Sequence, residues 1–132
     1  MKIENIKFKA KRLDGKGWVK GSLLRSTAGI KERAYVVDSF SSMSDYSVIG
    51  VDISTVCQFT GLKDCKGNEL WEGDILEGYP KCEIVFSKGT FATRFIDYDG
   101  EECVDPLCHF IKEDGTVECK VVGNKFDRKS RV

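Results

Sequence analysis

The cysteines and the single histidine are the side chains of this 132-residue chain that could support nucleophilic or metal chemistry. A nucleophilic enzyme needs a nucleophile, a base and a group that orients the base. His109 directly follows Cys108, and neighbours on a strand point to opposite faces, so these two cannot act together. The chain has no Cys-x-x-Cys pair, and the tightest pair, Cys103 and Cys108, has four residues between. We therefore expect no catalytic residue, no metal site and no cofactor, and predict that the protein is not an enzyme.

An acidic run from Asp97 to Asp105 is the other candidate for chemistry, because its carboxylates alternate. It lacks the twelve-residue loop and the terminal bidentate Glu of a calcium-binding EF-hand. Polar residues around Asp99-Gly100 are typical of a solvated hairpin tip, which is what we predict here. The six cysteines are expected to be free thiols, with Cys82 and Cys119 as small buried hydrophobes on strand faces.

The charges of the chain are unevenly distributed although they sum to zero. Residues 1–33 carry a balance of +7, residues 34–124 a balance of −10, and the last eight residues a balance of +3. This asymmetry indicates either a nucleic-acid-facing end or a basic part that lies against an acidic part, within one molecule or between two.

A basic hairpin is predicted near the N-terminus. Residues 6–13 alternate as a strand does, Asp14-Gly15-Lys16-Gly17 suits a tight turn, and residues 18–24 return as the partner strand. Its candidate contacts for nucleic acid or a partner are Lys7, Lys9, Lys11, Arg12, Lys16 and Trp18. The alternative, which the pattern alone favours, is that these lysines form the solvated face of an edge hairpin and protect it from pairing.

The middle of the chain is expected to contain short strands at 34–37 and 48–59, separated by a Ser-rich loop at 39–46. A glycine-punctuated stretch follows at 58–73, where turn residues shape a bend and large apolar residues close over a core. We assign it a structural role carried by Gln58, Thr60, Gly61, Leu62, Asp64, Gly67, Trp71, Gly73 and Asp74.

Residues 80–123 predict an antiparallel meander of short strands with glycine turns, including strands at 104–111 and 116–123. The fold class is therefore mostly β, with an N-terminal β-rich sub-domain that could be α+β, followed by a small SH3-like β-barrel. We place the sub-domain at 1–57, a connecting motif at 58–73, the barrel at 74–124 and a frayed basic tail at 125–132.

Several blocks of this sequence resemble the YopX family of bacteriophage and prophage proteins. The blocks are Ile6–Arg12, Gly17–Leu23, Val56–Asp64, Gly67, Trp71–Ile75 and Val121–Asn124. The resemblance implies a mostly β protein whose SH3-like barrel begins near Glu72, and it carries over no catalytic residue. Many members end with an Asn-Pro-Glu-Leu-like segment, which Lys125–Lys129 replaces here.

Two function classes follow. The first, which we favour from sequence, is a phage- or prophage-encoded accessory protein that acts as a small interaction module, binding a phage or host protein or assembling as a homo-oligomer. The alternative is a nucleic-acid-binding accessory protein that uses the basic hairpin. The chain has no run of 18 apolar residues and no apolar signal region at its N-terminus, so we expect no membrane partner and a cytoplasmic location in a bacterial host.

Overall fold

The computed structural model describes residues 2–38, 47–78 and 80–127, so the predicted Ser-rich loop at 39–46 and the end of the basic tail lie outside the described residues. Within them the protein is mostly β, as predicted, with two antiparallel sheets and short 3-10 turns in place of longer helices. The chain divides into two compact units, Met1–Phe59 and Thr60–Val132. The division falls inside the segment 58–73 that the sequence analysis treated as a connection.

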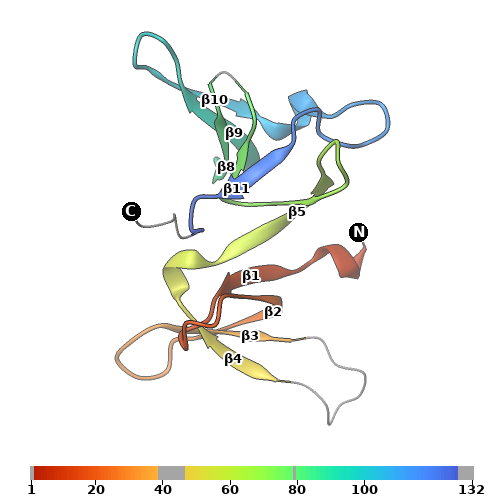
Figure 1. Cartoon of the computed structure of the whole chain (residues 1–132). Coiled ribbons are helices and arrows are strands. Elements are labelled where there is room, and N and C mark those ends of the chain that lie inside the picture. Colours follow the sequence, from red (N-terminus) through yellow and green to blue (C-terminus); the bar gives the residue numbers. More distant parts are fainter. Residues whose placement is uncertain (1, 39–46, 79, 128–132) are drawn as a thin grey trace. The chain divides into compact units, whose positions relative to one another are not determined.

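The first unit, coloured red to yellow in Figure 1, is a meander whose strands pair in the order β4-β3-β2-β1-β5. A short 3-10 turn, η1 (Ile3–Asn5), precedes them. The strands are β1 (Phe8–Lys11), β2 (Trp18–Ser26), β3 (Arg33–Val37), β4 (Val48–Val51) and β5 (Cys57–Lys63), with the 3-10 turn η2 (Ile53–Thr55) before β5.

Alternation along these strands separates a buried face from a polar one. Ala10 lies opposite Val19, and Ala34 lies opposite Val51, so all four side chains fall on one face. Together with Val36 they form the buried core of this unit. The other face carries the residues between them, including the lysines of β1.

Strand β1 is paired along both of its edges. Its first residues pair with β5, at Phe8↔Gln58. Beyond its last residue, Leu13 N–H donates to the Gly50 carbonyl at 3.1 Å, and Asp52 N–H donates to the Lys11 carbonyl at 2.9 Å. These two bonds join the end of β1 to the end of β4, so the sheet curls until its first and fourth strands meet.

The single strand predicted at 48–59 is wrong, because η2 divides it into β4 and β5. Asp52 causes the break. Its side chain accepts from the N–H and from the hydroxyl of Ser54, at 3.0 and 2.8 Å, and its carbonyl accepts from Thr55 N–H. A short polar side chain that bonds its own backbone offers the chain an alternative to the sheet ladder.

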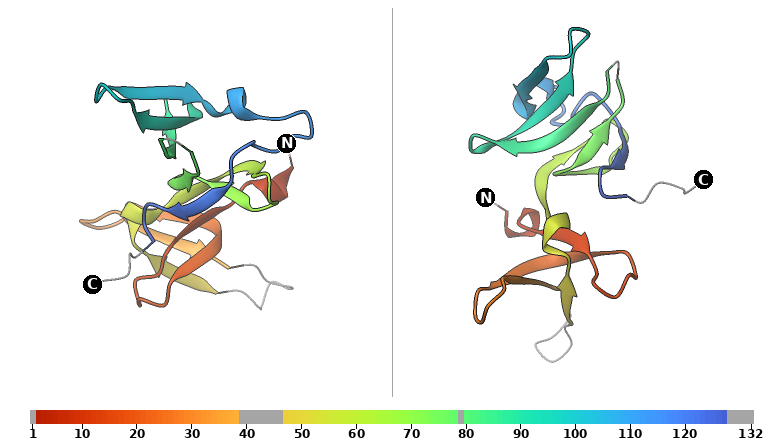
Figure 2. Two further views of the ribbon diagram at one scale, coloured as in Figure 1. Left: turned by 45° about the horizontal axis from the view of Figure 1, so that its top comes forward. Right: turned by 90° about the vertical axis from the view of Figure 1, so that its left-hand side faces the viewer.

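The second unit, coloured green to blue in Figures 1 and 2, has the order β10-β9-β8-β7-β11. Its elements are β6 (Glu69–Trp71), β7 (Asp74–Leu76), β8 (Cys82–Ser87), β9 (Thr90–Ile96), β10 (Glu102–Pro106), the 3-10 turn η3 (Leu107–Phe110) and β11 (Val121–Asn124). Leu70, Leu76, Ile84, Leu107 and Val117 form its core.

Both units follow one topology. In each, four consecutive strands form a meander, a 3-10 turn follows the fourth, and the fifth strand pairs antiparallel with the first. The sequence analysis expected a barrel only in 74–124 and did not identify this correspondence. In the described part of the second unit, β10 and β11 end the strand order without pairing to each other, so barrel closure there stays a prediction.

Two predicted strands of the second unit are shorter than expected. The one at 104–111 ends at Pro106, after which η3 begins, because proline cannot donate to the ladder. The one at 116–123 is reduced to β11 and two isolated bridges at Val117, with Asp64 and with Ile111. The tail at 125–132 was predicted to be frayed, but its first residue is hydrogen-bonded to the second unit, since Lys125 N–H donates to the Gly73 carbonyl at 2.8 Å.

Candidate nucleic-acid interface

Strand β1 is an interior strand of the first unit, with β2 on one side and β5 on the other. Lysines on an exposed edge strand protect the edge from pairing with another chain. That explanation, which the sequence alone favoured for Lys7, Lys9 and Lys11, does not apply to a strand whose two edges are already paired.

The register of the hairpin brings cations and an aromatic ring onto one face. Lys9 lies opposite Lys20, and Lys11 lies opposite Trp18. Directly opposed residues of an antiparallel pair share a face, so these four side chains are neighbours on the side away from Ala10 and Val19. We call Lys9, Lys11, Trp18 and Lys20 the lysine–tryptophan face.

Two of these lysines lie over the indole ring. Lys9 Nζ is 4.5 Å from a Trp18 ring centroid and Lys11 Nζ is 5.1 Å from one, within the range of cation–π attraction. Just before β1, Lys7 Nζ lies 4.7 Å from the ring centroid of Phe59. The rings hold the lysine side chains against the sheet, so the cations are grouped in space as well as in sequence.

Arg12 and Lys16 do not join this face, although the sequence analysis grouped them with it. The Arg12 guanidinium forms an ion pair with Asp14 at 2.7 Å, and the backbone N–H of Lys16 donates to the same carboxylate at 3.0 Å. The bond from Arg12, followed by that from Lys16, lowers the pKa of Asp14 to about 2. Arg12, Asp14 and Lys16 therefore stabilise the turn.

Lys20 is the member of the face that the sequence analysis missed. Pairing Lys11 with Trp18 across the Asp14–Gly17 turn would have placed it opposite Lys9. The length of the turn fixes this register and could have identified Lys20. The candidate contacts were instead chosen because they are close together in the sequence.

The predicted structural motif occupies β5, β6, β7 and the turns between them. Gln58 pairs with Phe8, Thr60 donates its hydroxyl to the Leu70 carbonyl at 2.9 Å, and Leu62 packs on the core of the second unit. Gly61 and Gly67 have positive φ angles with open space around them, and Trp71 is buried.

Asp64 is the fully buried carboxylate of this motif, and its oxygens accept four hydrogen bonds. Oδ1 accepts from the N–H groups of Lys66 and Asn68, at 2.9 and 2.8 Å. Oδ2 accepts from the Asn68 side chain at 3.2 Å and from Val121 N–H at 2.9 Å. Asp64 thus holds its own turn closed and fastens that turn to β11, 57 residues further along the chain.

The pKa of Asp64 is expected to control stability in acid. Burial raises this pKa, but the hydrogen bonds from Val121, Asn68 and Lys66 together outweigh burial, so it lies below the ordinary value of 3.8. A carboxyl whose folded pKa is depressed stabilises the fold above its unfolded pKa, and this contribution is lost as the pH falls through the folded pKa.

We therefore expect the side-chain carboxyl of Asp64, followed by NMR during acid titration, to titrate below 3.8. The free energy of unfolding of the second unit should decrease over the same interval. A midpoint above 3.8 would mean that burial outweighs the hydrogen bonds, and the account of this turn would then be wrong.

A second buried hydrogen-bond cluster, besides that of Asp64, lies between the start of β7 and the end of β11 and consists of Gly73, Asp74 and Asn124. The Asn124 amide nitrogen donates to Asp74 Oδ1 at 2.9 Å and to the Glu72 carbonyl at 3.2 Å. Asp74 Oδ2 accepts from Trp71 N–H at 2.8 Å. A Cβ on Gly73 would lie 3.2 and 3.3 Å from the Asn124 amide atoms, so the amide would have to shift by a few tenths of an ångström to admit a side chain. Asn124 was quoted in the family blocks but left out of the predicted motif.

The cysteines and the histidine do not gather into a site within the described residues. No group of three or more Cys, His, Asp or Glu side chains there is arranged to hold a metal ion. Cys82 and Cys119 are half-buried rather than buried, and the fully buried thiol is that of Cys57, which donates to the Thr55 carbonyl at 3.3 Å. Burial raises the pKa of both Cys82 and Cys119, which disfavours the reactive thiolate.

Comparison with protein families matches most of this chain. The family model described as YopX protein matches residues 7–130, a range that includes strands of both units and both buried hydrogen-bond clusters. No curated protein matches the sequence. In the described part of the chain, none of the helical segments is long and apolar enough to cross a membrane.

Proposed function

The chain belongs to the YopX family, and we propose that it is an accessory protein whose first unit binds single-stranded nucleic acid through the lysine–tryptophan face. The observation that carries the proposal is the grouping of Lys9, Lys11 and Lys20 around Trp18 on an interior strand pair. Phosphates would draw the ammonium groups of Lys9 and Lys11 off the indole ring, which they cover in the unbound protein, and a base would then stack on the ring. Proteins that bind single strands without sequence preference combine these two elements.

Further elements of the proposal concern the setting of this activity. The protein acts in the cytoplasm of a bacterial host, is encoded by a phage or prophage and is not an enzyme. Its first unit and, as predicted from sequence, the segment 74–124 are SH3-like barrels. The five-strand order with a 3-10 turn before the last strand supports this, as do the bonds between β1 and β4 in the first unit.

A binding measurement tests the proposal. A fluorescently labelled 20-nucleotide oligo(dT) should bind at 50 mM salt, and the affinity should fall steeply towards 200 mM salt. Replacing Lys9 and Lys11 together by Ala should weaken binding about tenfold and reduce the salt slope by about 1.4, since each lysine–phosphate contact to a single strand contributes about 0.7.

Lys81→Ala is the matched control, because it removes an exposed lysine of the second unit. It should leave the affinity and the slope nearly unchanged, and all variants should keep the melting temperature of the parent. Absence of binding at tens of micromolar protein, or an equal effect of Lys81→Ala, would refute the proposal.

A protein-interaction module, the function favoured from sequence, remains the second candidate. A specific observation supports it: the first unit has a groove lined by aliphatic and charged side chains, apart from the lysine–tryptophan face.

A further inference from the structure

Three segments of the first unit enclose a groove of about 410 Å³. They are the turn after β1, the start of β3, and the end of β4 with η2. The lining residues are Leu13, Lys31, Glu32, Arg33, Ala34, Tyr35, Val51, Asp52 and Ile53. None of them belongs to the lysine–tryptophan face. A volume of this size lies in the range of ligand-binding pockets.

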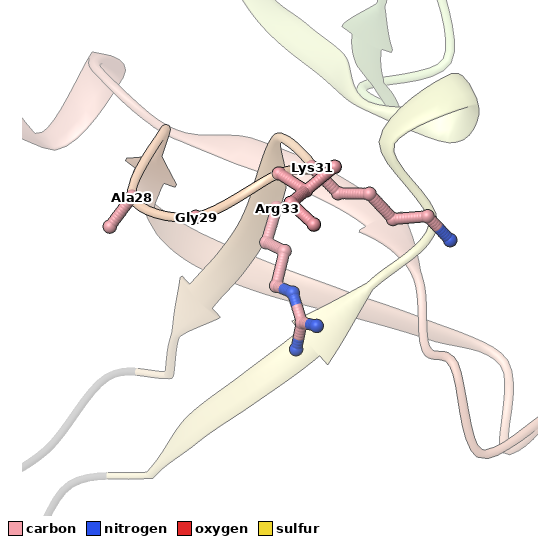
Figure 3. Close-up of a pocket in the computed structure, with 5 residues that line it drawn as sticks. Ala28, Gly29, Lys31 and Arg33 are labelled. Carbon is pink, nitrogen blue, oxygen red and sulfur yellow. The ribbon is translucent and has the colours of Figure 1, made fainter.

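A second hollow, of about 560 Å³, adjoins the groove (Figure 3). Lys31 and Arg33 line both, with Lys31 in the β2–β3 connection and Arg33 at the first position of β3. Ile30, which lines this second hollow, has a completely exposed side chain.

The apolar part of the groove is unusually accessible. Val51 and Ala34 form a buried floor, whereas Leu13 is 71% exposed and Ile53 is 42% exposed. Single exposed aliphatic residues are common on protein surfaces, but several around one hollow mark an interaction site.

Two cations of the groove stay available to a ligand, although the formal charges of its lining residues Lys31, Glu32, Arg33 and Asp52 sum to zero. Glu32 forms an ion pair with Arg25, and Asp52 accepts hydrogen bonds from Ser54. Within the described residues, Lys31 and Arg33 form no ion pair. The groove therefore complements a ligand that combines carboxylates with an apolar side chain.

The β9–β10 turn of this chain has that chemistry. It carries Asp97, Asp99 and Glu101 around Tyr98, whose side chain is 98% exposed. The turn is rigid, because Asp97 Oδ1 accepts from the N–H groups of Asp99 and Glu101, both at 2.9 Å. The backbone of the turn is therefore ordered before binding, and binding has to order only side chains such as that of Tyr98.

We propose that the groove of one copy binds the acidic β9–β10 turn of a second copy, with Tyr98 over the aliphatic floor and Asp99 and Glu101 against Lys31 and Arg33. Such a contact joins two different surfaces. Two copies that exchange it reciprocally form a closed dimer, and copies that do not reciprocate form chains. The proposal is independent of nucleic-acid binding.

Analytical ultracentrifugation over about 1–100 µM protein at 50 mM salt tests it. The parent protein should rise from its monomer mass of 14.8 kDa towards about twice that value or more. A groove variant, Lys31→Glu with Arg33→Glu, should stay monomeric. A turn variant, Asp99→Lys with Glu101→Lys, should also stay monomeric, and neither set removes a hydrogen bond that shapes its loop.

Mixing the two variants is the decisive step. Each variant reverses the charge of one side of the contact. The acidic groove of the first variant should therefore bind the basic turn of the second. Association should return when the two variants are mixed and should be absent from each variant by itself. A misfolded variant could not give this result. Monomers at every concentration of the parent protein, association that survives either variant, or a mixture that stays monomeric would each overturn the proposal.

Discussion

Replacing Asp64 by Ala should destabilise the second unit by at least about 3 kcal/mol, since each hydrogen bond to a charged acceptor contributes about 1.5–3 kcal/mol. The substitution removes a fully buried acceptor of four bonds, three of them from the N–H groups of Lys66, Asn68 and Val121. For a unit of this size, a loss of 3 kcal/mol lowers the melting temperature by about 15 °C.

The measurement is thermal and urea unfolding, followed by Trp71 fluorescence in a Trp18→Phe background that leaves one tryptophan. Asp114→Ala is the control, because Asp114 lies in the same unit as Trp71. Asp114 also accepts from the N–H two residues later, but its turn is exposed, so its replacement should change the free energy of unfolding far less, as surface ion pairs generally contribute little. Equal effects of the two substitutions would show that the buried carboxylate does not hold β11.

Replacing Gly73 by Ala should cost about 3 kcal/mol, from two separate causes. A side chain at a φ of +87° is strained by about 1–2 kcal/mol. The added Cβ would also press on the Asn124 amide, which is fixed by its bonds to Asp74 and Glu72; forcing atoms into a packed site costs about 1–3 kcal/mol.

Gly67→Ala separates these causes. Gly67 has nearly the same φ, +86°, with no atom within 4 Å of the added Cβ. Its replacement should therefore cost the strain alone, and the difference between the two variants in urea unfolding measures the contact with Asn124. If Gly67→Ala lowers the free energy of unfolding as much as Gly73→Ala does, the contact with Asn124 does not contribute to the requirement for glycine at position 73.

Local patterns in the sequence predicted those parts of the fold that depend on neighbouring residues. Alternation identified β1, and Asp14-Gly15 identified its turn. Asp64 and Gly67 were recognised as turn residues because a short polar side chain and a left-handed glycine act within a few positions. The family blocks were recognised for the same reason, as they are contiguous.

The parts that were missed depend on contacts between distant residues. Pairing with β5 makes β1 an interior strand, and only that pairing removes the edge-protection explanation for its lysines. The bond from Val121 to Asp64 and the insertion of Asn124 beside Gly73 likewise join positions about 50 residues apart or more. No local pattern encodes these distant contacts, so the lysine–tryptophan face was predicted in part and the two buried hydrogen-bond clusters were not predicted.

The shared topology of the two units has a kinetic consequence. In each, the first strand is completed by the fifth, through Phe8↔Gln58 in one and Asp74↔Asn124 in the other, each pair 50 residues apart. Closing such long loops is slow relative to forming a hairpin, so the meander should form first and the fifth strand should dock last. During synthesis, all five strands of the first unit have left the ribosome before those of the second are complete, and the chain can acquire its two cores one after the other.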